Sequence, residues 1–320
     1  MIKTFIEKNS GLIFGSTLLL GILLPLDIKN IGNIIKILLI LMLYISFLNV
    51  DFSHIKKELK HPGELLIQIV WNFLLVPVIL FFIIQQLGFP QFAIAAMLLA
   101  AMPGGLAGPV LTNIAGGRVA TSIVITVVTH IIAPLSLPLL FWIFTDLGVD
   151  IDVISLTTQL SILVGVPIGM ALISRTYLKK MIKSSIKYHK IISILALTIV
   201  AYLVIIPNSE TIRNNFLSII PILIGVYILY SVLCLTSFAL SKNREPKEQA
   251  AIIITRVYMN NALAIVLAYQ FFSPEIALIT VLAEIPWFTT FGIYLWFQKK
   301  FIGLNPTPET QEKIPSLNSI

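Results

Sequence analysis

Apolar stretches of about twenty residues recur along the whole chain of 320 residues. A helix of that length crosses a hydrocarbon core of about 30 Å, so each stretch is long enough to span a membrane. The composition agrees, because 57% of the residues are hydrophobic and only 12% are charged, against roughly 25% charged in an ordinary soluble domain. The pattern therefore predicts an all-α polytopic membrane protein and excludes a soluble globular domain.

Ten membrane spans are expected from these stretches. Their approximate bounds are residues 10–26, 31–50, 64–86, 90–115, 117–145, 152–174, 188–206, 215–240, 250–271 and 275–297. The first span has the outline of a signal peptide, with basic residues before an apolar run. We interpret it as a retained helix, because the run is long for a signal peptide and no A-x-A cleavage site follows it.

The basic residues segregate strongly between the two sides of these spans. With the N-terminus inside, 18 of the 22 Lys and Arg residues fall in the cytoplasm and only Lys29 and Arg213 fall outside, while Lys36 and Arg256 lie within spans. The positive-inside rule therefore predicts a multi-pass protein of the inner (plasma) membrane with both termini cytoplasmic. The net charge of +7 is explained by these short loops, so no nucleic-acid partner is expected.

The chain divides near an acidic segment that contains Asp146, Asp150 and Asp152. Five spans precede this segment and five follow it, and an odd number of spans in each half places the halves in opposite orientations. This is the inverted-repeat plan of many secondary transporters. The expected units are a first five-helix repeat at 1–145, a second and inverted repeat at 152–300, and a disordered cytoplasmic tail at 301–320.

Span four is interrupted about half-way along its length by Pro103-Gly104-Gly105 and, shortly after, by Gly108 and Pro109. Proline removes a backbone donor and glycine costs about 1 kcal/mol against alanine, so this segment is predicted to break the helix. In lipid such a break survives only when it is buried in protein or lines a wet cavity. Gly104 and Gly105 are therefore candidate substrate-binding residues.

Span nine carries two adjacent amides, Asn260 and Asn261, in the sequence TRVYMNN at 255–261. At 1.5 Å per residue they lie roughly 15 Å deep, near the middle of the bilayer. They either cross-link helices or present donors and acceptors to a ligand. Because span nine holds in its repeat the place of span four, we interpret it as a second broken helix and both asparagines as substrate-binding candidates.

These motifs resemble the bile acid:sodium symporter family, within the bile acid, arsenite and riboflavin transporter superfamily. The resemblance rests on the Pro103-Gly104-Gly105 break, on GGRVATS at 116–122 and on NNALA at 260–264. It implies a core domain from spans 3, 4, 5, 8, 9 and 10, and a panel domain from spans 1, 2, 6 and 7. It also implies that a small organic anion binds between the two domains and is carried by alternating access.

The family's sodium ligands are largely missing from this sequence. Where sodium-coupled members carry a Ser-Asn pair, this chain has Gly108 and Pro109, and the family's sodium-binding glutamate aligns with Thr255 or Arg256. The remaining ion-coupling candidates are Asn72, Ser122, Thr126 and His130. Sodium is a hard cation that needs several oxygen ligands, so sodium coupling at the family's two sites is not expected. Sodium symport through the remaining ligands stays as the alternative.

Two charged residues and one histidine inside spans add further hypotheses. Arg256 either replaces the charge of sodium and pairs with a substrate carboxylate, or reaches back to water along its own helix. Glu284, near the middle of span ten, either faces the substrate cavity or forms a salt bridge with Arg256. His130 either carries a proton, which keeps H⁺ coupling open, or is a hydrogen-bonded packing group.

Other functional classes fit the sequence less well. A membrane enzyme would need a catalytic motif at one face, and no H-E-x-x-H, G-x-S-x-G or P-loop motif occurs, so no catalytic residue, bound metal or cofactor is expected. A channel is disfavoured because a broken helix in each half suits alternating access better than a static pore. Substrate identity, coupling ion, transport direction and oligomeric state stay open, and a monomer fits the sequence.

Overall fold

The computed structural model describes residues 10–48, 67, 69–143, 152–214 and 216–306, and within them it is helical, with no β-strand. The helices are α2 (Ser10–Leu23), α3 (Ile31–Leu48), a π-helical turn (Trp71–Leu75) that continues into α6 (Val76–Gln86), α7 (Pro90–Ala101), α8 (Gly108–Ile114), α9 (Val119–Ile143), α10 (Val153–Tyr177), α11 (Lys179–Ile205), α12 (Ser209–Asn214), α13 (Phe216–Leu240), α14 (Pro246–Val257), α15 (Asn261–Phe271), α16 (Pro274–Leu282), α17 (Glu284–Thr289) and α18 (Phe291–Phe301). The predicted all-α class is confirmed.

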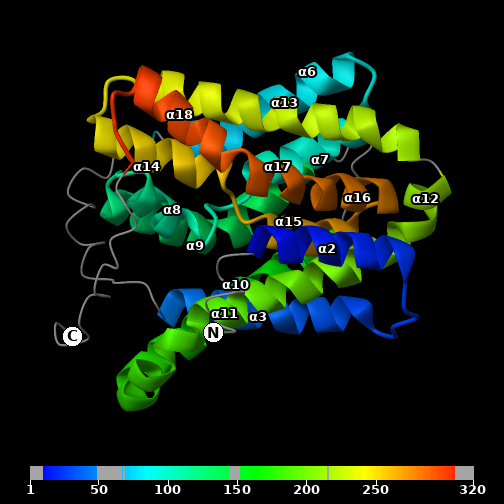
Figure 1. Cartoon of the computed structure of the whole chain (residues 1–320), viewed down its shortest axis with the longest axis horizontal. Helices are drawn as coiled ribbons and strands as arrows, with labels where there is room; N and C mark the ends of the chain where they lie inside the picture. The colour runs from blue at the N-terminus through cyan, green and yellow to red at the C-terminus, as the bar shows by residue number, and fades with distance from the viewer. Residues whose placement is uncertain (1–9, 49–66, 68, 144–151, 215, 307–320) are drawn as a thin grey trace.

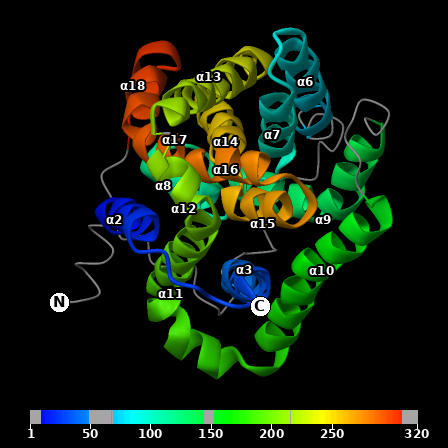
Figure 2. The same ribbon diagram turned by 90° about the vertical axis from the view of Figure 1, so that its right-hand side faces the viewer.

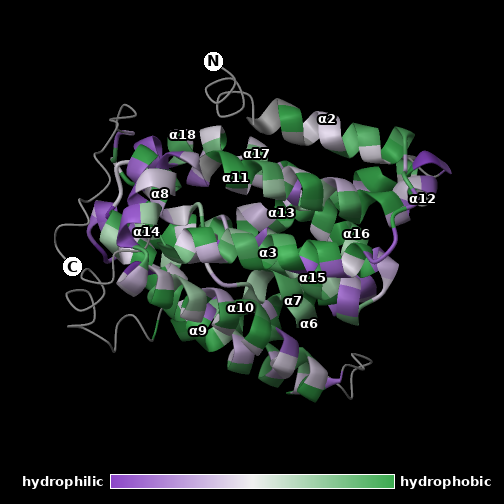
Figure 3. Ribbon diagram, turned by 90° about the horizontal axis from the view of Figure 1, so that it is seen from below, coloured by the Kyte–Doolittle hydropathy of each residue, from purple (hydrophilic) through white to green (hydrophobic). Residues whose placement is uncertain are grey.

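Several of these helices are long and apolar enough to cross a membrane. Among the described residues five pass as single helices, and a sixth passes if the pair Pro274–Thr289 and Phe291–Phe301, bent by 54°, is one span. Figure 3 shows that hydrophilic residues gather toward the two ends of the long helices and that mostly apolar residues lie between them. A multi-pass membrane protein follows, whereas the division into ten spans and two inverted repeats stays a prediction.

The helices form two layers. One layer contains α2, α3, α10 and α11, which pack mainly on one another, and the other contains α6 to α9 and α13 to α18 (Figures 1 and 2). The layers touch where α10 packs on α9 and where α3 and α11 pack on α15. One continuous cluster of buried apolar side chains extends through both layers. We call them the four-helix layer and the broken-helix layer.

Local sequence explains where many of these helices begin. Pro90, Pro246 and Pro274 each stand at the first position of a helix, where the missing N–H has no intrahelical partner to lose. Asp152 caps α10, because its carboxylate accepts hydrogen bonds from the amides of Ile154 and Ser155, each at 3.1 Å.

One boundary differs clearly from the sequence-based expectation. Helix α11 begins at Lys179 rather than near residue 188, so the basic segment after span six is helical. Lysine favours helix almost as well as alanine, and apolar periodicity marks the membrane edge rather than the helix end. The junction of α10 and α11 accordingly projects beyond the other helices (Figure 1). Asp146, Asp150 and most of the predicted tail, 307–320, lie outside the described residues.

Candidate functional site

The two interrupted helices meet at their breaks. Helix α7 ends at Ala101 and α8 begins at Gly108, while α14 ends at Val257 and α15 begins at Asn261. Between them Gly104 and Met259 form an isolated antiparallel β-bridge. We call this contact, formed by residues 102–107 and 258–260, the crossing.

Main-chain hydrogen bonds join the two segments of the crossing. The amide of Gly105 donates to the carbonyl oxygen of Tyr258 at 2.9 Å, and the amide of Asn260 donates to the carbonyl oxygen of Pro103 at 2.9 Å. Each break thus satisfies backbone groups that the other has freed, which removes much of the cost of leaving polar groups unpaired inside a membrane.

The two glycines of the break allow the chains to approach this closely. A Cβ atom added to Gly105 would lie 2.0 Å from the carbonyl oxygen of Tyr258, and one added to Gly104 would lie 2.3 Å from the Cγ2 of Thr255. Both distances are far inside van der Waals contact, so glycine is required for the close backbone approach. Close packing therefore explains why glycine occupies positions 104 and 105, whether or not these residues bind a substrate.

Span five supplies a hydroxyl that the sequence analysis missed. Thr129 on α9 accepts a hydrogen bond from the amide of Gly104 at 3.1 Å and donates to the carbonyl oxygen of Ile125 at 2.7 Å. It stands three residues after Thr126, close to the helix face of Ser122 and Thr126. Extending that face by one turn would have found it.

Asn260 and His130 form a buried pair beside the crossing. The Nδ1 of His130 lies 2.7 Å from the carbonyl oxygen of Thr126, which can only accept, so Nδ1 carries the proton. The Nε2 of His130 then accepts from the side-chain amide of Asn260 at 3.0 Å. The Oδ1 of Asn260 accepts from the amide of Leu263 at 3.2 Å and caps α15. The geometry favours the hydrogen-bonded packing group over the proton carrier for His130.

Asn261 faces a different neighbour. Its side-chain amide donates to the hydroxyl of Tyr230 on α13 at 2.8 Å, and its Oδ1 is buried without a hydrogen-bond partner. The two adjacent asparagines therefore reach toward opposite elements, Asn260 toward α9 and Asn261 toward α13. Tyr230 was not singled out from the sequence, because a tyrosine in an apolar helix carries no signal of its own.

Arg256, in the last turn of α14, is only 1% exposed. Its Nη1 donates to the main-chain carbonyl of Ala100, and its guanidinium lies over the ring of Phe73, with 5.2 Å from Cζ to the ring centroid. Its Nε and Nη2 have no hydrogen-bond partner among the residues that the structure describes. Among the described residues no carboxylate lies within 4.0 Å of it. Arg256 is therefore a buried cation without a counter-ion in the described part of the chain.

For each of the two buried charges, one of the alternatives open from the sequence is absent from this conformation. Arg256 does not reach back to water, because its guanidinium turns into the protein toward Ala100. It also forms no salt bridge with Glu284, which is itself 2% exposed and has no basic nitrogen of a described residue within 4.0 Å. The depth estimates allowed that pair, but depth along the membrane does not fix the direction in which each side chain leaves its helix.

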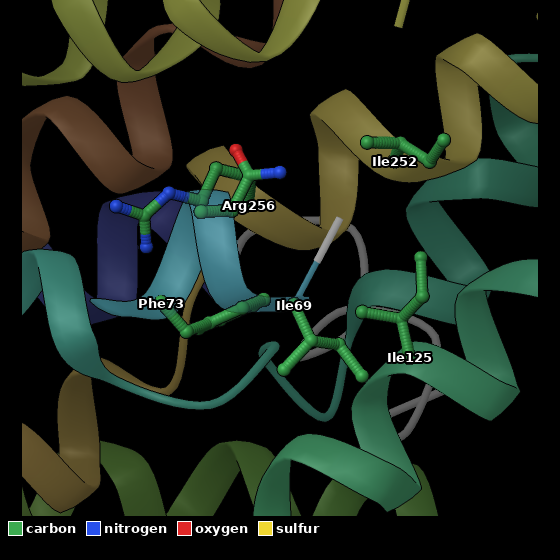
Figure 4. A pocket seen from close by; sticks show the side chains of 6 residues that line it. Ile69, Phe73, Ile125, Ile252 and Arg256 are labelled. Carbon is green, nitrogen blue, oxygen red and sulfur yellow. The ribbon is translucent and has the colours of Figure 1, made fainter. Parts of the chain in front are cut away.

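A small cavity of about 10 Å³ lies beside Arg256 (Figure 4). It is lined by Ile69, Asn72, Phe73, Ile125, Ile252 and Arg256. Asn72 enters it from the π-helical turn before α6, a local irregularity that is frequent at functional sites. The volume suits about one water molecule, so an organic anion does not fit in this conformation.

The hydroxyls of Ser122, Thr126 and Thr255 cluster beside the break in span four. The Oγ of Ser122 lies 3.1 Å from the Oγ1 of Thr255, and Thr126 is 4% exposed with no partner for its Oγ1. A Cβ atom added to Gly108 would lie 3.3 Å from the Oγ of Ser122. The structure thus brings the predicted Ser122 and Thr126 together with Gly108, and adds Thr255.

Aromatic residues of the last span cover the other side of the crossing. The ring of Tyr258 packs edge-on against Trp287 and Phe291, with centroid distances of 5.7 and 5.5 Å. The indole N–H of Trp287 donates to the carbonyl oxygen of Met259 at 3.2 Å. These contacts fix the crossing against α17 and α18, and the sequence analysis did not foresee them.

Comparisons with known proteins agree with the resemblance seen in the sequence. A sequence model of the sodium bile acid symporter family matches residues 36–215, more than half of the chain. The chain is 25% identical over 259 residues to the uncharacterized sodium-dependent transporter YocS of Bacillus subtilis (strain 168), covering 80% of this chain and 79% of that protein. It is 26% identical over 137 residues to the probable sodium/metabolite cotransporter BASS1, chloroplastic, of Arabidopsis thaliana, covering 42% of this chain and 34% of that protein.

Proposed function

Because the chain belongs to the sodium bile acid symporter family, we propose that it is a secondary active transporter that moves a small organic anion without sodium at the family's two cation sites. Membership in the family makes the chain a membrane transporter and not an enzyme. The anion, the coupling ion and the mechanism are the proposal. The proposal rests on one observation: the guanidinium of Arg256, a residue of α14, is buried against the last turn of α7.

Arg256 stands where a bound cation would be stabilised. The carbonyls of the last turn of a helix have no intrahelical partner and carry the negative end of the helix dipole. In transporters with broken helices, such half-helix ends and unwound carbonyls coordinate the coupling cation. Arg256 donates to Ala100, one residue before the end of α7, and so supplies a permanent positive charge at this position.

The side chains around the break do not replace the missing sodium ligands. Gly108 and Pro109 offer no side-chain oxygen, and Thr255 and Arg256 bring no carboxylate. The fixed charge of Arg256 would also repel a second cation close to it. Both facts favour sodium-independent transport.

Sodium symport is the second candidate, and the hydroxyl cluster favours it. Thr126 has a buried Oγ1 without a partner, and Ser122 and Thr255 lie in the same cluster. Both relatives also carry sodium in their names. Three hydroxyls and nearby carbonyls would give a site poorer in charge than one with a carboxylate, so any sodium bound there would be held weakly.

The substrate is proposed to be an organic anion because Arg256 has buried N–H groups that are available to a ligand. Its Nε and Nη2 are buried and donate to no described residue. A carboxylate would accept from a guanidinium with favourable charge-assisted geometry. Since the cavity beside Arg256 holds about one water molecule and is lined by residues of α9, α14 and the segment before α6, the anion would reach these donors only after helices within the broken-helix layer also move apart.

Alternating access would then consist of motion of the broken-helix layer against the four-helix layer. The proposed frame is ten spans in two inverted repeats, with a core of α6 to α9 and α13 to α18 and a panel of α2, α3, α10 and α11. The proposed setting is the inner (plasma) membrane with cytoplasmic termini, as the distribution of Lys and Arg favours. The bilayer and the anion are the partners, and no cofactor is required.

The proposal is tested with purified protein in two steps. A thermal-shift screen against monocarboxylates, dicarboxylates and sulfonates, in sodium and in potassium buffers, identifies anions that stabilise the protein. Counterflow in proteoliposomes with the best radiolabelled anion then tests carriage. Saturable counterflow of equal rate in both buffers supports the proposal, whereas counterflow that needs sodium supports the second candidate and no counterflow refutes both.

A further inference from the structure

Glu284 is a buried acid that is not hydrogen-bonded to the crossing and forms no ion pair with Arg256. It begins α17 and is 2% exposed, and no basic nitrogen of a described residue lies within 4.0 Å of its carboxylate. An ionised carboxylate in an apolar interior is costly unless it is paired, and such a group commonly takes up a proton instead. Acids inside membrane spans accordingly mark proton relays and ion pathways.

The elements around α17 offer no compensating charge at this depth. Helices α13, α16 and α18 pack against α17. Their titratable residues are Tyr227, Tyr230 and Cys234 on α13, Glu275 on α16, and Tyr294, Lys299 and Lys300 on α18, with Tyr258 added from the crossing through its contact with Thr290. Glu275 and both lysines lie exposed at outer helix ends, so the groups that face the interior are phenols and one thiol.

Glu284 lies within electrostatic reach of Tyr230, which is hydrogen-bonded to a residue next to the crossing. Tyr230 is close enough to interact electrostatically with Glu284, and its hydroxyl accepts from the side-chain amide of Asn261 at 2.8 Å. The O–H of Tyr230 stays free to donate. Asn261 is the first residue of α15 and follows Asn260 of the crossing. We therefore expect a change of charge at Glu284 to alter the hydrogen bond between Tyr230 and Asn261 at the start of α15.

We propose that Glu284 is a proton-binding site of the transport cycle. Its carboxylate takes up one proton while the broken-helix layer is closed, and the resulting carboxylic acid releases that proton to water when the helices packed on α17 move apart and admit water. One proton is bound and one is released in each cycle, with no other bond formed or broken. The inference rests on the proposed function, because a carrier without sodium at the crossing needs another ion for active transport.

Infrared spectroscopy of the full chain in lipid bilayers tests proton binding directly, with the proton as the only probe. A protonated buried carboxyl group gives a separate C=O stretching band. The band is expected in the wild type at neutral pH, and it should fade as the pH rises. It should be absent from Glu284→Gln and unchanged in the matched control Glu275→Gln, which alters an exposed acid of the same span. A wild type without the band, or a band that persists in Glu284→Gln, overturns the proposal.

A second variant keeps the test decisive if Glu284→Gln does not fold. Tyr230→Phe leaves the carboxyl group in place and removes a hydroxyl that interacts electrostatically with it, so the band should remain and shift in frequency. An unshifted band would contradict the proposed link through Tyr230.

Hydrogen exchange then tests the link to transport. After correction for the chemical exchange rate, the amides of 258–264 should exchange faster at alkaline pH in the wild type and in Glu275→Gln, but not in Glu284→Gln. Equal pH dependence in all three proteins would refute the coupling. Neither measurement uses an anion or sodium, so their failure is distinguishable from failure of the proposed function.

Discussion

The guanidinium of Arg256 donates a hydrogen bond to the main-chain carbonyl of Ala100, one residue before α7 breaks. The two residues come from different halves of the chain, 156 positions apart. A half-helix that ends inside the membrane thus meets a permanent cation delivered by the other broken helix.

Alanine at position 105 should destabilise the crossing. A Cβ atom there would meet the carbonyl oxygen of Tyr258 at 2.0 Å. Forcing the two segments of the crossing apart should cost about 1–3 kcal/mol. Gly165 on α10, where an added Cβ meets nothing within 4 Å, is the matched control. Gly165→Ala should be neutral or stabilise by about 0.5–1 kcal/mol. Equal unfolding midpoints in detergent for the two variants would mean that the crossing is not tightly packed.

Valine at position 129 should destabilise the protein because the amide of Gly104 loses its acceptor. Thr129→Val keeps the shape but leaves the amide of Gly104 without an acceptor, which should cost about 1–3 kcal/mol. Thr198→Val is the control, because the hydroxyl of Thr198 bonds only to its own helix, at Ile194. Chemical denaturation of both variants checks the difference, and a Thr129→Val protein as stable as its control would contradict the bond to Gly104.

Two substitutions of Asn260 separate its roles. Asn260→Ser keeps a cap acceptor for α15 and loses the contact with His130, whereas Asn260→Ala loses both. The alanine variant should therefore be less stable than the serine variant by about 1 kcal/mol, the usual value of a helix cap. Thermal unfolding measures this difference. Indistinguishable midpoints would show that the cap of α15 contributes nothing.

Sequence patterns were sufficient to predict that spans four and nine are broken, but not that the two breaks contact each other. The prolines and glycines of 103–109 act locally, through lost donors and backbone freedom, so span four could be predicted to open. The bonds between Gly105 and Tyr258 and between Asn260 and Pro103 join segments more than 150 residues apart. No local propensity encodes such a pairing.

The direction in which buried side chains point could not be predicted from the sequence either. Helical spacing placed Ser122 and Thr126 on one face, and the structure puts both beside Gly108. Spacing could not decide whether Arg256 turned toward water or toward Ala100, because both directions are open to a long side chain. For the same reason Tyr230 could not be predicted to be the partner of Asn261.

A neutral residue at position 256 should separate stability from function. Arg256→Met removes a buried charge that has no counter-ion among the described residues, and the desolvation cost relieved should outweigh the loss of its hydrogen bond to Ala100. The variant should unfold no earlier than the wild type but should lose anion-dependent stabilisation. Arg244→Met, at a partly exposed ion pair with Glu248, is the control and should change stability by less than about 1 kcal/mol. A large loss of stability in Arg256→Met alone would make Arg256 a structural residue.

An acid at position 256 should restore a response to sodium. Arg256→Glu replaces the fixed cation by a carboxylate on the helix that also carries Thr255 of the hydroxyl cluster, beside the end of α7. Sodium at 100 times its dissociation constant would then stabilise the variant by about 2.7 kcal/mol. Arg256→Gln, which lacks the negative charge, should show a smaller response, and the measurement is thermal unfolding in sodium against potassium chloride. No gain of sodium response in Arg256→Glu would count against the substitution of sodium by Arg256.

The most direct test of sodium independence is the unfolding temperature of the wild-type protein in sodium chloride and in potassium chloride at equal ionic strength. With Arg256 in the place of the cation, the two temperatures should coincide over the whole range of salt concentration. A rise that is specific to sodium and saturates with its concentration would contradict the account.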